Sequence, residues 1–210
     1  MIHDLALVGE IRRHFDVFLN PPFALGQKTI HNEALMTQFT HKNLTQGIIA
    51  INTGDQRDMM ISSHLMIQNN RAIFVDCGTN YCVPRLLRVL QEKGLTPERV
   101  DFLILTHIHL DHAGGAGELM RALPQAKLLV HPRGQRHMVD PSKLFAGATA
   151  VYGEEFMMKN YGQLLPIDAD RILTPADEEV LDWHGRPLRF LHTEGHAKHH
   201  FCIWDAQSKH

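Results

Sequence analysis

The first twenty residues place apolar side chains at spacings of three and four, from Ile2 to Leu19. This period predicts an amphipathic helix, and packing on the core is favoured over a partner or membrane role. The Asn20-Pro21-Pro22 stretch must end it, because proline cannot continue a helix. Residues 23–45 are polar and weakly patterned, so we expect a loop or a short helix there. We therefore treat residues 1–45 as an N-terminal extension.

From Gly47 onward the apolar residues gather in short runs bounded by turns. GIIAINTG, SHLMIQ and AIFVDCGT predict strands, with a hairpin turn at Asn69-Asn70. PRLLRVLQEKG predicts a helix, with Pro84 in its first turn and Gly94 at its end. DFLILT predicts the next strand.

The second half continues this mixture of helices and strands. We expect a helix over AGELMRAL, a strand over KLLV and helical structure from about Pro132 to Tyr161. Four strands should follow, with a hairpin turn at His184-Gly185: RILTP, EEVLDW, RPLRFLHT and HHFCIWD. Interleaved helices and strands predict an α/β or layered α+β fold, and we expect residues 46–210 to form one domain.

Composition and charge narrow the possible partners. Lys and Arg total 21 against 23 for Asp and Glu, with no long block of one sign, so no nucleic-acid or anionic-membrane partner is predicted. No run reaches the roughly 18 apolar residues of a membrane span, and the N-terminus lacks a signal-peptide core. The chain has three cysteines and no CxxC pair, which favours a reducing, cytoplasmic location: Cys77, Cys82 and Cys202.

Histidine is the unusual feature, with 16 in the chain. Residues 106–115 read THIHLDHAGG, directly after the predicted strand, and hold His107, His109, Asp111 and His112. Alternation along an extended segment puts His107 and His109 on the same side. A lone histidine is usually an ordinary surface or core residue. Four imidazole and carboxylate groups beside two glycines that permit a sharp turn instead predict a zinc, iron or manganese site.

HIHLDH at the end of a strand resembles the HxHxDH signature of the metallo-β-lactamase-fold hydrolase superfamily. FVDCGT upstream and HTEGHAKHH downstream match two further blocks in the right order, so the resemblance covers roughly Gly47 to Asp205. It implies an αβ/βα sandwich and two divalent metal ions, zinc before iron or manganese. By this resemblance, the ligands of one ion are His107, His109 and His196. The protein's ligands of the second ion include Asp111 and His112. Asp76 resembles a residue that orients ligands, although a simple turn residue is an equal alternative.

The chain departs from the family pattern in two places. Glu194 stands where proline is common, which puts the shape of the loop near His196 in doubt. The family also carries a bridging aspartate on a later strand and a last histidine further on. Asp205 ends the strand HHFCIWD and is not expected to be that bridge. We therefore expect a fold lacking its C-terminal part, an incomplete second metal site and a tendency to form homo-oligomers.

Other candidates for the pocket are weaker. Alternation along a strand turns at least one of His199 and His200 outward, and for the other a place at the site and an outward position are equal alternatives. A surface position is favoured for His131 and His137. Cys77 and Cys82 are expected to be packing residues. The stretch from Pro132 to Pro166 is long for a connection, and its apolar residues either cover the sheet or roof the pocket, which would favour a substrate with an apolar part: Leu144, Phe145, Val151, Tyr152, Phe156 and Met157.

These observations predict a metallo-hydrolase in which a metal-bound hydroxide, oriented by Asp111, attacks an ester, thioester or lactone. Leu110 stands where the tRNA-processing branch of the family looks to carry glycine, which disfavours a nuclease. His112 and the missing leader disfavour a secreted β-lactamase. No GxSxG elbow supports a serine mechanism. The alternatives are a non-hydrolytic di-iron oxygen-binding or redox protein, or a metal-binding subunit that needs a partner.

Overall fold

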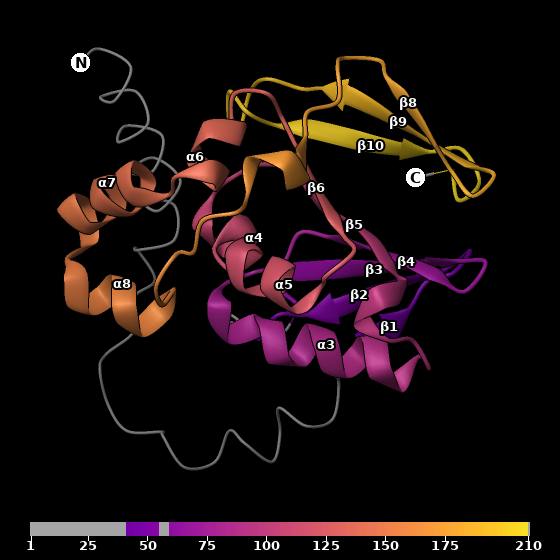
Figure 1. The fold of residues 1–210 in the computed structure, drawn as a ribbon, viewed down its shortest axis with the longest axis horizontal. Coiled ribbons are helices and arrows are strands. Elements are labelled where there is room, and N and C mark those ends of the chain that lie inside the picture. The colour runs from indigo at the N-terminus through magenta and orange to yellow at the C-terminus, as the bar shows by residue number, and fades with distance from the viewer. Residues whose placement is uncertain (1–40, 55–58, 210) are drawn as a thin grey trace.

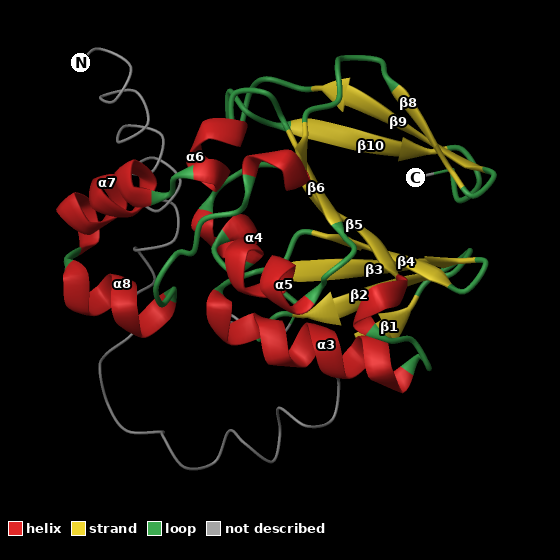
Figure 2. Ribbon diagram, in the orientation of Figure 1, coloured by secondary structure: helices red, strands yellow, loops and turns green. Residues whose placement is uncertain are grey.

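Two β-sheets and a layer of helices make up the part of the chain that the computed structural model describes, residues 41–54 and 59–209 (Figures 1 and 2). The larger sheet has seven strands in sequence order: β1 (His41–Asn43), β2 (Ile48–Asn52), β3 (Ser62–Gln68), β4 (Arg71–Val75), β5 (Val100–Leu105), β6 (Lys127–Val130) and β7 (Ile172–Leu173). The smaller sheet is antiparallel, in the order β10-β9-β8: β8 (Val180–Trp183), β9 (Arg186–His192) and β10 (Phe201–Asp205).

Helices cover one face of the larger sheet, and the smaller sheet covers the other (Figure 1). The covering helices are α3 (Val83–Glu92), α4 (Leu110–Ala113) and α5 (Ala116–Ala122). Three more helices lie together at one end of the molecule: α6 (Gln135–Val139), α7 (Ser142–Tyr152) and α8 (Glu154–Asn160). Short 3-10 turns complete the path: η1 (Asn80–Cys82), η2 (Pro97–Arg99) and η3 (Ala169–Arg171).

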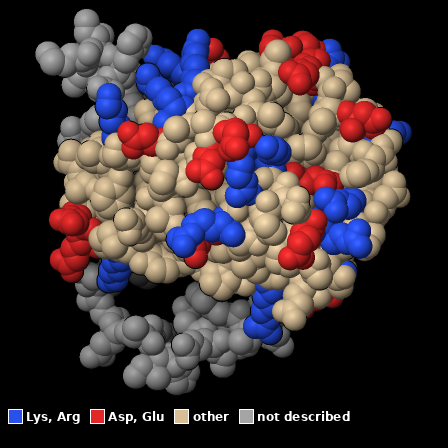
Figure 3. Space-filling model, viewed as in Figure 1, with Lys and Arg blue, Asp and Glu red and all other residues tan. Residues whose placement is uncertain are grey.

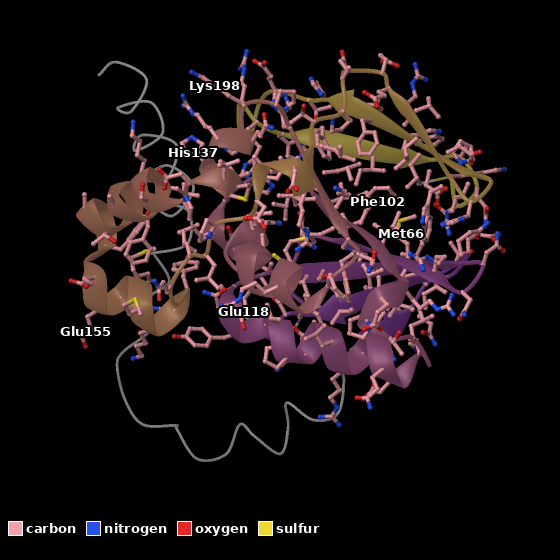
Figure 4. The ribbon with its side chains drawn as sticks, in the orientation of Figure 1. Met66, Phe102, Glu118, His137, Glu155 and Lys198 are labelled. Carbon is pink, nitrogen blue, oxygen red and sulfur yellow. The ribbon has the colours of Figure 1, made fainter. Side chains whose placement is uncertain are left out.

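Alternation along the strands produces two cores, one on each face of the larger sheet. In β5, Leu103 and Leu105 pack under the helices, whereas Ile104 packs against the smaller sheet. Met66 and Phe102, labelled in Figure 4, also lie between the two sheets. Successive side chains of a strand point to opposite faces, so a strand covered on both faces must be apolar throughout, as FLIL is. The layers confirm the expected layered α/β fold.

The sheet topology gathers several loop segments at one edge. Pairs from β1 to β4 are antiparallel, and pairs from β4 to β7 are parallel. The carboxyl ends of β4, β5 and β6 therefore meet at the same edge, where open α/β sheets commonly bind ligands. The Phe201 amide donates to the Thr106 carbonyl oxygen at 3.0 Å, which ties the start of β10 to that edge.

Most of the predicted elements are confirmed. The hairpin residues Asn69 and Asn70 have φ of 48° and 58°, as a tight turn requires, and His184 and Gly185 at the β8–β9 turn have 53° and 83°. Pro84 lies in the first turn of α3. The helical stretch from Pro132 to Tyr161 is divided among α6, α7 and α8.

The prediction of a loop or helix over residues 23–45 is wrong at His41–Asn43, which form the edge strand β1. The HKN tripeptide has no apolar alternation to predict it. The helix expected from Ile2 to Leu19 lies outside the described residues, and the division at residue 45 stays a prediction. Within the described ranges, no helix has the length and apolar character needed to cross a bilayer. On the face drawn in Figure 3, basic and acidic side chains are interspersed.

Candidate metal centre

The segment between β5 and α4 carries two buried histidines. His107 and His109 are 3% and 5% exposed, and their ring centroids lie 4.6 Å apart. His109 is the N-cap residue of α4, so the next turn brings Asp111 and His112 to the same edge of the sheet. Gly115 permits the close approach of this turn to η1, because a Cβ there would lie 2.6 Å from the Thr79 carbonyl oxygen.

His196 reaches the same point from the loop between β9 and β10. Its Nε2 lies 3.3 Å from His107 Nε2 and 3.2 Å from His109 Nδ1. One possible ligand atom from each of the three residues lies within 4.8 Å of the others. A tetrahedral zinc ion with nitrogen ligands at about 2.05 Å would separate those nitrogens by about 3.3 Å. The three imidazoles therefore fit a divalent metal ion in both spacing and donor chemistry.

Hydrogen bonds around Asp76 fix the tautomer of His107. The Thr106 hydroxyl lies 2.8 Å from Asp76 Oδ2 and 3.0 Å from His107 Nδ1. A carboxylate only accepts, so the hydroxyl donates its one proton to Asp76 and accepts from His107 Nδ1–H. This leaves the lone pair of His107 on Nε2, the atom that faces His196.

Asp76 holds His112 in the same way. The His112 Nδ1–H donates to Asp76 Oδ2 at 2.9 Å, which leaves Nε2 as the coordinating atom of the neutral ring. That Nε2 lies 3.7 Å from Asp111 Oδ2, and the His112 ring lies 4.2 Å from the ring of His107. Asp111 and His112 thus form a second group of candidate ligands directly beside the first.

The backbone of Asp76 is in the left-handed region, with φ of 55°. Aspartate tolerates this region better than most residues. The Asp76 amide donates to the Ile104 carbonyl oxygen at 2.8 Å, and the Ser63 hydroxyl donates to the Asp76 carbonyl oxygen at 2.8 Å. Because the Thr106 amide also donates to Oδ1 at 2.8 Å, main chain and side chain are both fixed at the end of β4.

Burial keeps His107 neutral. Its pKa is far below the ordinary value, first through desolvation and then through the neighbouring rings of His112 and His109. For His112, burial opposes the charged form, but the hydrogen bond and charge of Asp76, together with Asp111, outweigh it and raise the pKa. Metal ions bind neutral imidazole, so burial favours the ligand form of His107, whereas the raised pKa of His112 works against its ligand form.

More histidines surround the ligand group than the sequence predicts. His200 Nδ1 lies 2.7 Å from the Thr193 hydroxyl, and its ring lies 5.4 Å from His107. His199 is 5% exposed, and burial, followed by His137 and His131, lowers its pKa to about 4. Both rings adjoin the site, where at most one was expected.

The surface position favoured for His131 and His137 is wrong. They are 4% and 5% exposed, because His131 follows β6 at the shared edge and His137 lies on α6, which covers that edge. The His131 ring lies 4.3 Å from His192, and burial followed by this neighbour lowers the His131 pKa to about 4. The position of His131 at the end of a parallel strand was the signal that could have predicted its burial.

Arg133 holds the His196 loop from outside. Its Nη1 lies 2.9 Å from Glu194 Oε1 and donates to the Lys198 carbonyl oxygen at 3.3 Å. One guanidinium therefore contacts the loop on both sides of His196. Glu194, which replaces the common proline, thus takes part in an ion pair that fixes the loop.

The remaining sequence candidates lie apart from the histidines or in packing positions. Tyr152 packs against the main core with its ring 5.6 Å from Phe156, and their place in a pocket stays a prediction. Beside these helices is a cavity of about 420 Å³ whose lining includes Phe145, Met158 and Leu164. Cys77 and Cys82 are buried, and burial raises the pKa of the Cys77 thiol. The Asp205 carboxylate accepts from buried Arg186, so it is already paired within the smaller sheet.

Comparison with known proteins agrees with this geometry. The family model described as the metallo-β-lactamase superfamily matches residues 57–210. A metallo-β-lactamase fold-containing protein of Sulfurisphaera tokodaii is 31% identical over 110 residues, 50% of this chain and 41% of that protein. A hydroxyacylglutathione hydrolase of Aeromonas salmonicida is 31% identical over 114 residues, 54% of this chain and 33% of that protein.

Among solved structures, an archaeal metallo-β-lactamase superfamily protein from Sulfolobus tokodaii superposes with a TM-score of 0.61 at 24% identity. The match covers 78% of this chain and 61% of that one. The chain thus spans less than two thirds of the length of these relatives. The family model covers most of the chain, in which HIHLDH ends a strand and its histidines meet His196, and the chain therefore belongs to the metallo-β-lactamase superfamily.

Proposed function

We propose that this chain carries the metal-binding residues of a hydrolase acting on an ester, thioester or lactone. The observation that carries the proposal is the convergence of His107, His109 and His196, with nitrogens 3.2 to 3.3 Å from His196 Nε2. Zinc is the ion we favour, because three nitrogen ligands and an open position suit it, and iron or manganese are the alternatives. When bound, such an ion supplies Lewis acidity and lowers the pKa of water from about 15.7 towards about 7.

Asp111 is the residue we assign to catalysis. It is 5% exposed, lies two positions after His109 in the first turn of α4, and places its Oδ2 3.7 Å from His112 Nε2. We assign it to orienting the attacking water and accepting its proton, and to holding a second ion together with His112 Nε2. Asp76 positions both groups, because it bonds His112 directly and His107 through Thr106.

The substrate class rests on two further observations. One relative is named for hydroxyacylglutathione, an acyl compound, which favours an acyl bond as the one cleaved. The cavity of about 420 Å³ lined by Phe145, Met158 and Leu164 suits the apolar part of such a substrate. We place Tyr152 and Phe156 near that part and His200 near the reacting group. A small-molecule substrate and a cytoplasmic location remain expectations from the sequence.

The deciding experiment measures metal content and then turnover. Protein prepared without chelators is analysed for zinc, iron and manganese, and tested on a panel of thioesters, lactones, phosphodiesters and β-lactams. We expect metal-dependent turnover of the acyl compounds, and an Asp111→Ala variant slower by orders of magnitude with its fold intact. Asp170→Ala, in the exposed turn η3, is the matched control and should retain activity.

The alternatives give different results in the same experiment. A di-iron redox protein would contain iron, show a charge-transfer absorption band and hydrolyse nothing. A subunit that needs a partner would bind metal but turn over only after the partner is added. Protein that binds none of the three metals, even after reconstitution, would contradict the proposal.

A further inference from the structure

His199 joins the two segments that carry the candidate ligands. It lies three positions after His196 in the β9–β10 loop, and it is 5% exposed. The Ile108 backbone N–H donates to its Nδ1 at 3.3 Å. Ile108 is fully buried and stands between His107 and His109. His199 Nδ1, from the β9–β10 loop, therefore accepts from the His107–Ile108 peptide of the other segment. Figure 4 shows the neighbouring Lys198 at the same end of the molecule as His137 of α6.

The orientation of the Ile108 peptide bears directly on the two ligands. Strand β5 ends at Leu105, and Ile108 lies between that strand and α4. A buried backbone N–H needs a partner, and a hydrogen bond to a fixed acceptor determines which way its peptide plane faces. Rotation of that plane would turn the Cα–Cβ bonds on both sides of it. The Ile108 N–H belongs to the His107–Ile108 peptide, so such a rotation would turn the His107 side chain relative to the His109 ring, 4.6 Å away.

Packing alone does not account for a histidine at this position. The His199 ring is stacked on that of His107 at 6.4 Å and perpendicular to that of His109 at 5.6 Å, so a leucine could fill the same space. Because Nδ1 accepts, the ring proton is on Nε2. Among the described residues that buried Nε2 has no hydrogen-bond partner. An unpartnered buried N–H is unfavourable, so what histidine adds here is the Nδ1 acceptor.

We propose that His199 is a positioning residue that couples the His196 loop to the His107–His109 pair through the Ile108 amide. The inference rests on the metal site proposed above. One loop then provides the third ligand and also the acceptor that sets the first two. The chain between His196 and His199 is short and held in a turn, since the His200 amide donates to the Ala197 carbonyl oxygen at 3.3 Å and the Ala197 side chain is fully buried. A displacement of the loop would therefore disturb all three ligands together.

Substitutions at residue 199 can distinguish the effect of the hydrogen-bond acceptor from the effect of side-chain volume. Asparagine presents an oxygen close to the place of Nδ1, whereas leucine fills the space without an acceptor, and glutamine presents its polar group near the place of Nε2. The first measurement is the hydrogen exchange of the Ile108 amide in metal-free protein, with the Leu103 amide of β5 as the internal reference for folding. The second is zinc affinity in competition with a chelator.

We expect His199→Asn to keep Ile108 protection and zinc affinity within a few-fold of wild type. His199→Leu and His199→Gln should each raise Ile108 exchange at least about tenfold, and weaken zinc binding by about 10–100-fold, the range typical of residues that orient metal ligands. His184→Asn, at the exposed β8–β9 turn, controls for the loss of a histidine and should change neither measurement.

Two results would overturn the inference. Leucine behaving like wild type would mean that the residue only fills space, and asparagine behaving like leucine would mean that the acceptor is irrelevant. If His199→Leu does not fold, the comparison of the Asn and Gln variants still decides. Wild-type protein that binds none of zinc, iron and manganese would remove the proposed function, but the Ile108 exchange rates would still report whether His199 holds that peptide.

Discussion

The two segments that meet at the candidate metal centre are built differently. Residues 106–112 leave the end of β5 in the middle of the larger sheet, and His107 and His109 are almost fully buried. The loop at 193–200 joins β9, the central strand of the smaller sheet, to its edge strand β10, and its ligand His196 is exposed. The first segment is held from beneath by Asp76, the second from its sides by Arg133 and by the His199 contact. The strand end is held mainly by Asp76 on the neighbouring strand of its own sheet, whereas the loop is held by contacts with more distant segments.

The largest expected effect comes from the buried ligands. His109→Ala should weaken zinc binding by more than about 100-fold, beyond the range typical of outer residues. His196→Ala should weaken it less, because His107 and His109 stay in place beside Asp111. Metal titration by calorimetry would compare the two. An equal or larger loss for His196→Ala would break the comparison, since the loop would then be as decisive as the strand end.

Asp76 should produce the next largest effect. Asp76→Asn replaces one accepting oxygen by an NH2 group, which would face a group that itself donates a hydrogen bond. We therefore expect zinc affinity to fall about 10–100-fold and the free energy of unfolding to fall by about 2 kcal/mol. Asp101→Asn is the matched control. Asp101 accepts from Arg71, Trp183 and His184, and it should lose stability without losing zinc affinity. A variant of Asp76 that keeps full zinc affinity would show that the strand end needs no such residue.

The pH dependence of stability should test the burial of His131 at this edge of the sheet. The folded-state pKa of His131 is about 4, whereas an unfolded histidine titrates near about 6.5. Between those values the unfolded chain binds a proton that the folded chain does not, so the stability of metal-free protein should fall as pH falls. His131→Asn retains an acceptor for the Arg133 amide. It should make the free energy of unfolding depend less steeply on pH, by an amount equivalent to at most about one bound proton. Denaturant unfolding from pH 7 to 4 measures it, and an unchanged slope would contradict the assignment.

The smallest effect is expected at the outer contact of the loop. Arg133 and Glu194 are 55% and 54% exposed, so Glu194→Ala should change stability by less than about 1 kcal/mol. Its effect on zinc affinity should be a few-fold, because Arg133 keeps its bond to Lys198. Glu178→Ala breaks the similarly exposed pair with Arg189 and should leave zinc affinity unchanged. Identical zinc affinities in the two variants would mean that the metal-binding position of His196 does not depend on the Arg133–Glu194 pair.

The sequence predicted those features of the fold and of the site that are determined by residues close together in the chain. HIHLDH follows an apolar strand, and the Asn69-Asn70 turn lies between two strands, so both features were visible locally. β1 was missed because a three-residue edge strand has too few positions to form a pattern. Spacing alone could not select His196, which the family resemblance identified and which the structure brings to the other two ligands.

Long-range contacts were beyond the sequence. Ile108 and His199 are separated by 91 positions, and nothing in either segment indicates the other. The Arg133 contacts with Glu194 and Lys198 also join separate segments, and Glu194 appeared in the sequence only as a departure from the usual proline. The burial of His131 follows from strand order, which was not predicted. Such contacts form only when the sheets are in place, and they hold the less rigid half of the site.

The left-handed backbone at Asp76 has a consequence for how this position tolerates mutation. Glycine, asparagine and aspartate adopt that conformation most readily, so a survey of all amino acids at residue 76 should find these three best for folding. Of the three, only aspartate brings a carboxylate to Thr106 and His112. Selection for soluble expression and selection for metal retention would therefore recover different sets of residues here. Asp76→Gly keeps the backbone conformation but loses the carboxylate, so it should fold with reduced stability and a poorly organised metal centre.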